Sequence, residues 1–127
     1  MNFYSAIQKY QNTDMHSKVE SSSKHGFVKI VLEELSQNLK ILKYSIENEQ
    51  KLSKNKSKSF ARIITSLSIL MSSLDFEKGE PIASNLFSLY EYCKKEVLAS
   101  YKNLDTKGLD DTIIIVEDIL SAWTEIG

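Results

Sequence analysis

Proline, glycine, cysteine and long apolar runs are all scarce in this chain of 127 residues. One proline and four glycines are too few to punctuate the many strands and turns of a β-rich fold, so long helices are favoured. The only cysteine, Cys93, excludes a disulfide framework. The chain has no apolar run of about 18 residues and no apolar signal core at its N-terminus. We therefore expect a cytoplasmic protein that does not insert into a membrane.

The formal net charge is small, but the charges are unevenly distributed. The total is −1, which gives no indication of a nucleic-acid partner or an anionic membrane surface. Residues 1–74 carry 11 basic and 6 acidic side chains, whereas residues 75–127 carry 5 and 11. Such asymmetry fits either attraction of a charged partner or ordinary solvated faces.

Four segments place apolar residues at helical spacing: His25 to about Gln50, 59–75, 81–103 and about 108–126. In the first segment these residues are separated by alternating steps of four and three, as on a helix that faces other helices: Val28, Leu32, Leu35, Leu39, Leu42 and Ile46. The pattern predicts an all-α fold, an antiparallel up-down-up-down four-helix bundle with a short N-terminal cap helix.

Three details of this pattern give separate expectations. Ile41 should widen the apolar face of the first helix. Lys51 to Ser59, with four lysines, three serines and no acid, should be a solvated loop. Ile69 falls outside the apolar stripe of the second helix, so it should be exposed or touch a partner.

The length suits a single domain, with 25–127 forming the bundle and 1–24 an N-terminal cap segment and linker. Phe3, Tyr4, Ile7 and Tyr10 stand at helical spacing, but residues 1–11 are too few to hold a helix alone in water. They need an apolar surface from the rest of the chain. Two interpretations remain open: a permanently docked terminal helix, or a detachable cap over a binding groove.

The turn between the second and third segments carries a family signature. It reads Ser73-Leu-Asp-Phe-Glu-Lys-Gly-Glu-Pro-Ile-Ala-Ser-Asn-Leu-Phe-Ser-Leu-Tyr-Glu-Tyr92. This run resembles the signature of the flagellin export chaperones, the FliS family, roughly S-L-D-x-E-K-G-G-E-I-A-x-N-L-x-x-L-Y-x-Y. It departs at Glu80, where a second glycine is usual, and at Pro81, where glutamate is usual. A fainter resemblance covers Ala99 to Glu125, with Ala122-Trp123 as its marker.

The resemblance implies a function and partners. Members of this family bind the disordered C-terminal segment of flagellin in the cytosol, prevent its premature polymerisation and help to present it to the flagellar type III export gate. Ile7 and Tyr10 resemble the apolar pair with which the family caps part of its binding surface when the client is absent. The protein would be a monomer or a weak homodimer.

Seven apolar residues near the turn are the candidates for a client-binding groove: Ile63, Leu67, Leu70, Met71, Leu86, Leu89 and Tyr90. Aromatic residues and methionine suit an adaptable partner groove. The competing interpretation is that these residues are ordinary core, and periodicity does not separate the two.

Residues for catalysis are not evident. Neither His16 nor His25 has a glutamate three residues before it, which is the pattern of di-metal helix bundles. Cys93 stands on an apolar helical face and is expected in the core, not as a nucleophile. We expect no enzyme, no cofactor and no metal. The alternatives to a chaperone are a structural helical subunit in a permanent homo-oligomer, or a small helical enzyme for which no residues can be nominated.

Overall fold

The computed structural model describes residues 23–49 and 53–126, and these contain four α-helices and no strand. The helices are α3 (Lys24–Glu49), α4 (Lys54–Ser72), α5 (Ile82–Asn103) and α6 (Lys107–Ile126). The expectation of an all-α fold is confirmed. The predicted cap residues Ile7 and Tyr10 lie outside the described residues.

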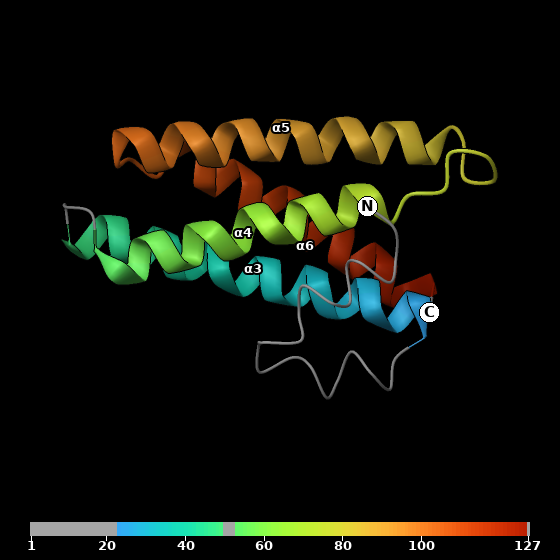
Figure 1. Cartoon of the computed structure of the whole chain (residues 1–127), viewed down its shortest axis with the longest axis horizontal. Helices are drawn as coiled ribbons and strands as arrows, with labels where there is room; N and C mark the ends of the chain where they lie inside the picture. The colour runs from blue at the N-terminus through green and yellow to red at the C-terminus, as the bar shows by residue number, and fades with distance from the viewer. Residues whose placement is uncertain (1–22, 50–52, 127) are drawn as a thin grey trace.

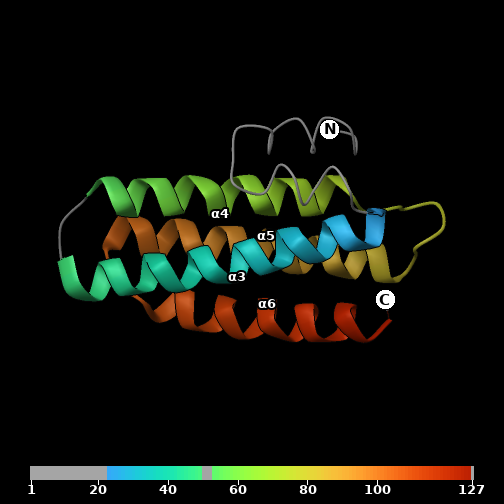
Figure 2. The ribbon, with the colours of Figure 1, turned by 90° about the horizontal axis from the view of Figure 1, so that it is seen from below.

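Each helix packs against two others. Helix α3 contacts α4 and α6, and α5 also contacts α4 and α6. The colours of Figure 1 show that successive helices run in opposite directions. In the perpendicular view of Figure 2, α3 lies between α4 and α6, with α5 behind. Ends of the helices that are far apart in sequence therefore meet at the two ends of the molecule.

The apolar seam predicted for α3 forms its buried face. All six seam residues are in the core: Val28, Leu32, Leu35, Leu39, Leu42 and Ile46. The prediction for Ile41 is wrong, because its side chain is 41% exposed. One residue corresponds to about 100° of helix rotation, so Ile41 is turned away from the stripe that contains Leu42.

Helix α4 begins earlier than the sequence pattern indicated, so the predicted loop from Lys51 to Ser59 is wrong beyond its first residues. Ser53 caps the helix, because its hydroxyl accepts the backbone N–H of Lys56 at 3.3 Å and its carbonyl accepts that of Ser57 at 3.0 Å. Lysine is a good helix former, and a serine N-cap satisfies a donor that would otherwise be unpaired. A run of lysines without acids therefore does not prevent a helix.

The other end of α4 also differs from expectation. The helix ends at Ser72, short of the predicted end at residue 75, and Ser73 forms the C-cap by donating its backbone N–H to the carbonyls of Ile69 and Leu70. Ile69, expected to be exposed or to touch a partner, is fully buried. It lies about 100° around the helix from Leu70, so α4 is covered over more of its circumference than its apolar stripe.

Helices α5 and α6 agree with their predicted bounds to within one residue. Leu104 ends α5 in the left-handed conformation, with φ of 53°, and its N–H bonds to the carbonyl of Ser100. At the start of α6, a Cβ added to Gly108 would lie 2.9 Å from the carbonyl oxygen of Glu96. Glycine therefore permits the close approach of α5 and α6.

Side chains on the surface also link the helices. Lys40 pairs with Glu117 and Lys43 with Asp110, at 3.3 and 2.7 Å, which joins α3 to α6. The rings of Phe60 and Tyr101 stack at 4.0 Å between centroids, across α4 and α5. Among the helices described, none is both long enough and apolar enough to cross a membrane.

Candidate functional site

The turn between α4 and α5 is organised by Asp75. Its carboxylate oxygen Oδ1 accepts the backbone N–H groups of Glu77 and Lys78 at 3.0 and 3.1 Å. Its backbone carbonyl accepts the N–H of Gly79 at 2.8 Å. A Cβ on Gly79 would lie 2.6 Å from that same carbonyl oxygen, so glycine is required there for the close approach.

Glu80 has a role that the sequence did not reveal. Its carboxylate accepts both the backbone N–H of Ser84, at 2.7 Å, and the hydroxyl of that serine. These bonds satisfy a donor in the first turn of α5, where an acidic side chain also complements the helix dipole. Glu80, one of the two departures from the FliS signature, therefore stabilises the start of α5. Pro81 occupies the N-cap, where a missing N–H costs nothing.

An apolar hollow of about 350 Å³ opens beside this turn. It is lined by residues of α3, α5 and α6 and of the turn that follows α4: Lys24, His25, Val28, Ser73, Leu74, Asp75, Gly79, Ile82, Ala83, Leu86 and Trp123. The side chains in its wall are mainly apolar, so water inside it gains few hydrogen bonds. An apolar side chain from a partner would displace that water at little cost.

Two ring side chains from opposite ends of the sequence form one wall of the hollow. The rings of His25 and Trp123 are stacked, with centroids 4.8 Å apart and planes inclined by 8°. His25 Nε2 donates to the backbone carbonyl of Trp123 at 2.9 Å, and Trp123 Nε1 donates to the carbonyl of His25 at 3.0 Å. The start of α3 is thereby fixed to the end of α6.

The seven predicted groove residues separate into two groups. Four side chains belong to the buried core: Ile63, Leu67, Leu70 and Tyr90. The other three are accessible to different degrees. Met71 and Leu86 are partly buried against the core, and Leu89 is 38% exposed. Of the seven, Leu86 alone lines the hollow. Whether any of them binds a partner stays a prediction.

Several accessible apolar residues lie on or next to the first half of α5. Ile82 is 66% exposed and Tyr92 is 43% exposed. Phe76 in the turn is also exposed, and its ring meets that of Phe87 edge to face at 5.9 Å. Of these residues, Ile82 also lines the hollow, so accessible apolar surface on α5 adjoins it.

The hollow includes residues that sequence reasoning did not assign to it. His25, Val28 and Trp123 are the clearest examples, because they come from α3 and α6 and not from the turn or the two helices that it joins. No local pattern pairs residues that are 98 positions apart. The one signal in the sequence was the resemblance marker Ala122-Trp123, and it indicated no partner for the tryptophan.

The titratable groups next to the predicted groove are held in their neutral forms. Burial raises the pKa of Cys93 from its ordinary value of 9.0 to about 11, and burial also raises the pKa of Tyr90. Cys93 is fully buried, as expected of a core residue. A buried thiol with a raised pKa is a poor nucleophile. Within residues 23–49 and 53–126, no three His, Cys, Asp or Glu side chains are grouped closely enough to hold a metal ion.

Comparison with known proteins decides the family. A family model described as "Flagellar protein FliS" matches residues 6–127. The chain belongs to the FliS family.

Curated relatives support this assignment over nearly the whole chain. The flagellar secretion chaperone FliS of Vibrio cholerae is 28% identical over 122 residues, which cover 95% of this chain and 88% of that protein. The FliS of Salmonella typhimurium is 27% identical, with 96% and 90% covered. The flagellar secretion chaperone FliSB of Pseudomonas aeruginosa is 25% identical, with 95% and 94% covered.

Membership of the FliS family also settles the class of protein. FliS proteins are chaperones of flagellar secretion and not enzymes, which confirms the expectation that the protein is not an enzyme. The features that matter for such a protein are accessible apolar surfaces and not reactive groups. In this FliS chain, the hollow of about 350 Å³ beside the α4–α5 turn is such a surface.

Proposed function

We propose that this FliS protein is a flagellin-specific export chaperone. It binds the disordered C-terminal segment of flagellin in the cytosol, prevents premature polymerisation and assists delivery to the flagellar type III export apparatus. Membership of the FliS family over residues 6–127 carries the proposal. The apolar hollow beside the signature turn supports it, because a chaperone of this kind needs a surface for apolar side chains.

The client would enter at the hollow and continue along α5. Leu86 lines the hollow, and Leu89 lies one helical turn further on with a 38% exposed side chain. Met71 adds a flexible, partly buried side chain from α4. Ile63, Leu67, Leu70 and Tyr90 are buried behind this surface, so they would touch the client only if the helices moved apart.

Recognition would be coupled to folding of the client. A disordered segment that forms helices on an apolar groove gains from burial but loses conformational entropy, at a cost of about 2–5 kcal/mol or more. That cost keeps the complex releasable, as delivery to an export apparatus demands.

The N-terminal cap segment and linker, 1–24, would regulate access to the antiparallel up-down-up-down bundle of residues 25–127. In this proposal Ile7 and Tyr10 form one face of a short cap helix that covers part of the client surface. Since the segment is too short to fold alone, it competes with the client for apolar surface. The apparent affinity for flagellin is then reduced by the fraction of molecules in the capped state.

The test is binding of the purified full chain to the C-terminal segment of flagellin from the same organism, followed by titration calorimetry and co-purification. We expect a one-to-one complex and a negative heat-capacity change, because apolar surface is buried. A flagellin segment with its apolar residues replaced by serine is the control and should not bind. Absence of any complex with the native segment would refute the proposal.

A further inference from the structure

A second hollow lies on another face of the molecule, in the outer groove between α3 and α4. It has a volume of about 210 Å³. We call it the basic groove, and its lining is Asn38, Ile41, Asn55, Lys58, Ser59 and Arg62. It shares no lining residue with the apolar hollow beside the α4–α5 turn. Nothing in the proposed binding of flagellin uses it.

The polar groups of the basic groove are rich in hydrogen-bond donors and positive charge. Lys58 has no acidic partner among residues 23–49 and 53–126. Arg62 gives one guanidinium nitrogen to Glu34 at 3.2 Å and is still 36% exposed. A guanidinium has five N–H donors, so most remain for a ligand. Glu34 is 14% exposed and its carboxylate compensates the charge of Arg62, so, among the described residues, the unpaired positive charge at the groove is that of Lys58.

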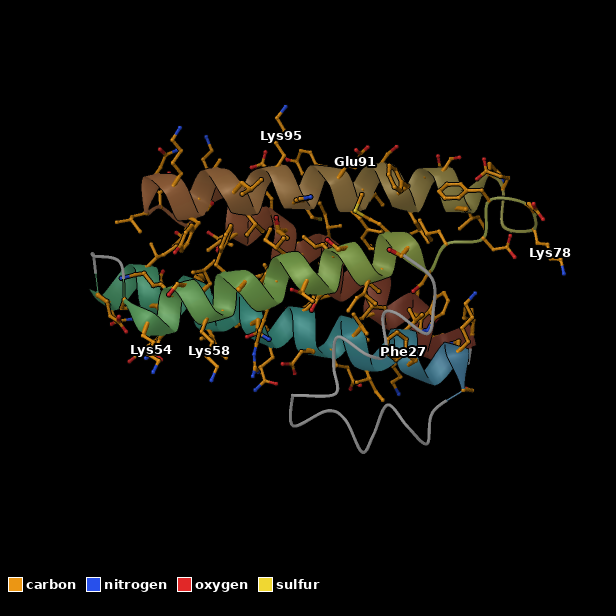
Figure 3. All side chains as sticks on the ribbon, viewed as in Figure 1. Phe27, Lys54, Lys58, Lys78, Glu91 and Lys95 are labelled. Carbon is orange, nitrogen blue, oxygen red and sulfur yellow. The ribbon has the colours of Figure 1, made fainter. Side chains whose placement is uncertain are left out.

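The positive charge extends along α4 beyond the hollow. Lys54, Lys58 and Arg62 stand four residues apart and so follow one side of the helix. Figure 3 shows Lys54 and Lys58 projecting on the same side of α4, whereas Lys95 projects from the opposite side of the molecule on α5. Lys54, like Lys58, has no ion-pair partner in the described part of the chain.

Apolar side chains flank this stripe on α3. Ile41 is 41% exposed and lines the groove, and Tyr44, one helical turn further, is 66% exposed. Neither side chain is required by the core of α3, whose seam is formed by other residues. A positively charged stripe beside apolar side chains is complementary to one face of a helix that carries both acids and an apolar anchor.

We propose that the basic groove is a second docking site, and that its occupant is an acidic amphipathic helical segment of a partner protein. The segment carries two carboxylates at positions i and i+4. One faces Lys58, and the other faces either Arg62 or Lys54. An apolar residue on the same face contacts Ile41 and Tyr44. Charge complementarity selects the occupant. The stripe has three cations, one of them paired with Glu34, so it would neutralise few phosphates, and electrostatic affinity for nucleic acid grows with the number of phosphates neutralised. An acidic peptide is therefore the better fit than a duplex.

The experiment uses the full chain and a synthetic, fluorescein-labelled helical peptide of about 15 residues, which spans about 22 Å. The peptide has glutamates at i and i+4 and a leucine between them on the same face. Fluorescence anisotropy should show saturable binding that weakens as salt is raised. Lys54→Glu with Lys58→Glu should weaken binding by about tenfold or more. Acidic residues are favourable in the first turns of a helix, so this variant is expected to fold.

The matched control changes the same number of charges elsewhere. Lys95→Glu with Lys102→Glu, on exposed residues of α5, should leave binding within about twofold, because neither residue lines the basic groove. A tenfold loss would correspond to about 1.4 kcal/mol. A charge-inverted peptide, with lysines for glutamates, should bind the Lys54→Glu, Lys58→Glu variant better than the wild type. Equal losses in the two variants would show a general charge effect and overturn the inference, as would the absence of saturable peptide binding.

Further outcomes separate this site from others. A DNA duplex of about 15 base pairs that binds more tightly than the peptide would overturn the choice of an acidic protein segment. Self-association that is abolished by Lys54→Glu with Lys58→Glu would make a second copy of the chain the occupant and overturn the assignment to a different partner.

The flagellin segment should bind the double variant normally. If flagellin binding is lost with it, the groove belongs to the client site and the second site fails, while the proposed function stands. If the peptide binds but the flagellin segment does not bind even the wild type, the second site stands and the proposed function fails.

Discussion

His25 and Trp123 hold each other by two hydrogen bonds and a ring stack. Each ring nitrogen donates to the other residue's backbone carbonyl, at 2.9 and 3.0 Å, and the ring centroids are 4.8 Å apart. Because the pair bridges α3 and α6 at the rim of the apolar hollow, it joins the stability of the bundle to the shape of the candidate client site. Without this pair, the start of α3 and the end of α6 next to the α4–α5 turn would not be connected by these hydrogen bonds.

Trp123 should therefore contribute to stability through both its ring and its N–H group. Trp123→Phe retains an aromatic ring but loses one hydrogen bond, for a loss of about 1 kcal/mol in the free energy of unfolding. Trp123→Ala loses the stack as well and should cost about 2–3 kcal/mol, somewhat less than a fully buried tryptophan. Urea unfolding followed by circular dichroism measures both. A loss below about 1 kcal/mol for the alanine variant would show that the pair is incidental.

Gly108 should not accept a side chain. A Cβ there would lie 2.7 Å from Glu96 Oε2 and 2.9 Å from both the carbonyl oxygen of Glu96 and the hydroxyl of Ser100. The side chain of Glu96 can move away, but its carbonyl cannot move without disturbing α5. Gly108→Ala should therefore destabilise the protein by about 1–3 kcal/mol, although alanine is the better helix former.

Ser100 provides the control for that prediction. Its hydroxyl is buried and has no hydrogen-bond partner among the described residues. Ser100→Ala removes an unpaired polar atom, so it should be neutral or slightly stabilising. In a double-mutant cycle by urea unfolding, Ser100→Ala should relieve part of the cost of Gly108→Ala, because one of the three clashing atoms is gone. Strict additivity would place the whole clash on Glu96.

Stability should fall in alkaline solution, partly because of Cys93. Its folded pKa of about 11 lies above its ordinary value of 9.0, so the folded state holds the thiol proton more tightly than the unfolded state. This contribution is complete below pH 9 and is lost as the pH rises towards 11. Burial raises the pKa of Tyr90 in the same sense, so its contribution is lost at higher pH still.

The measurement is the urea midpoint between pH 7 and about 11, for the wild type and for Cys93→Ala. The alanine variant is less stable at neutral pH, because it leaves a cavity, but its stability should decline less steeply above pH 9. Parallel pH curves for the two proteins would exclude a contribution from the thiol.

Two positions on α5 test the proposed client surface. Leu86→Ala shortens a side chain in the wall of the hollow, and Leu89→Asp places a charge at a 38% exposed position. Each should weaken binding of the flagellin segment by about tenfold, or about 1.4 kcal/mol. Ile114→Asp is the control, because Ile114 is 61% exposed on α6 and does not line the hollow. Titration calorimetry would contradict the surface if the control lost as much affinity as the two α5 variants.

The proposed cap predicts a difference in protection within the N-terminal segment. Hydrogen exchange over residues 2–11 should change when the flagellin segment binds, because cap and client compete for apolar surface. Ile7→Ala with Tyr10→Ala should leave the bundle folded, raise protease sensitivity before residue 24 and, on balance, lower client affinity, since an aromatic anchor commonly serves the bound state too. Unchanged protection despite confirmed binding would make residues 2–11 a plain docked helix.

Local periodicity determined the helices of this protein and most of its core. The alternation of four and three in α3 predicted a buried stripe, and the structure buries every residue of it. The reason is physical: residues spaced this way lie on one side of a helix whatever the helix packs against. The N-cap at Ser53 was not predicted, because the lysines after it were interpreted as a solvated loop.

Tertiary structure alone decided which surfaces stay open. Ile41 was expected inside and is exposed, whereas Ile69 was expected outside and is buried, because exposure depends on the neighbouring helices and not on the residue's own helix. The apolar hollow needs three helices and the α4–α5 turn, and the pair His25–Trp123 joins positions 98 residues apart. Contacts of that range leave no trace in local spacing. They arise only when the four amphipathic faces are packed together.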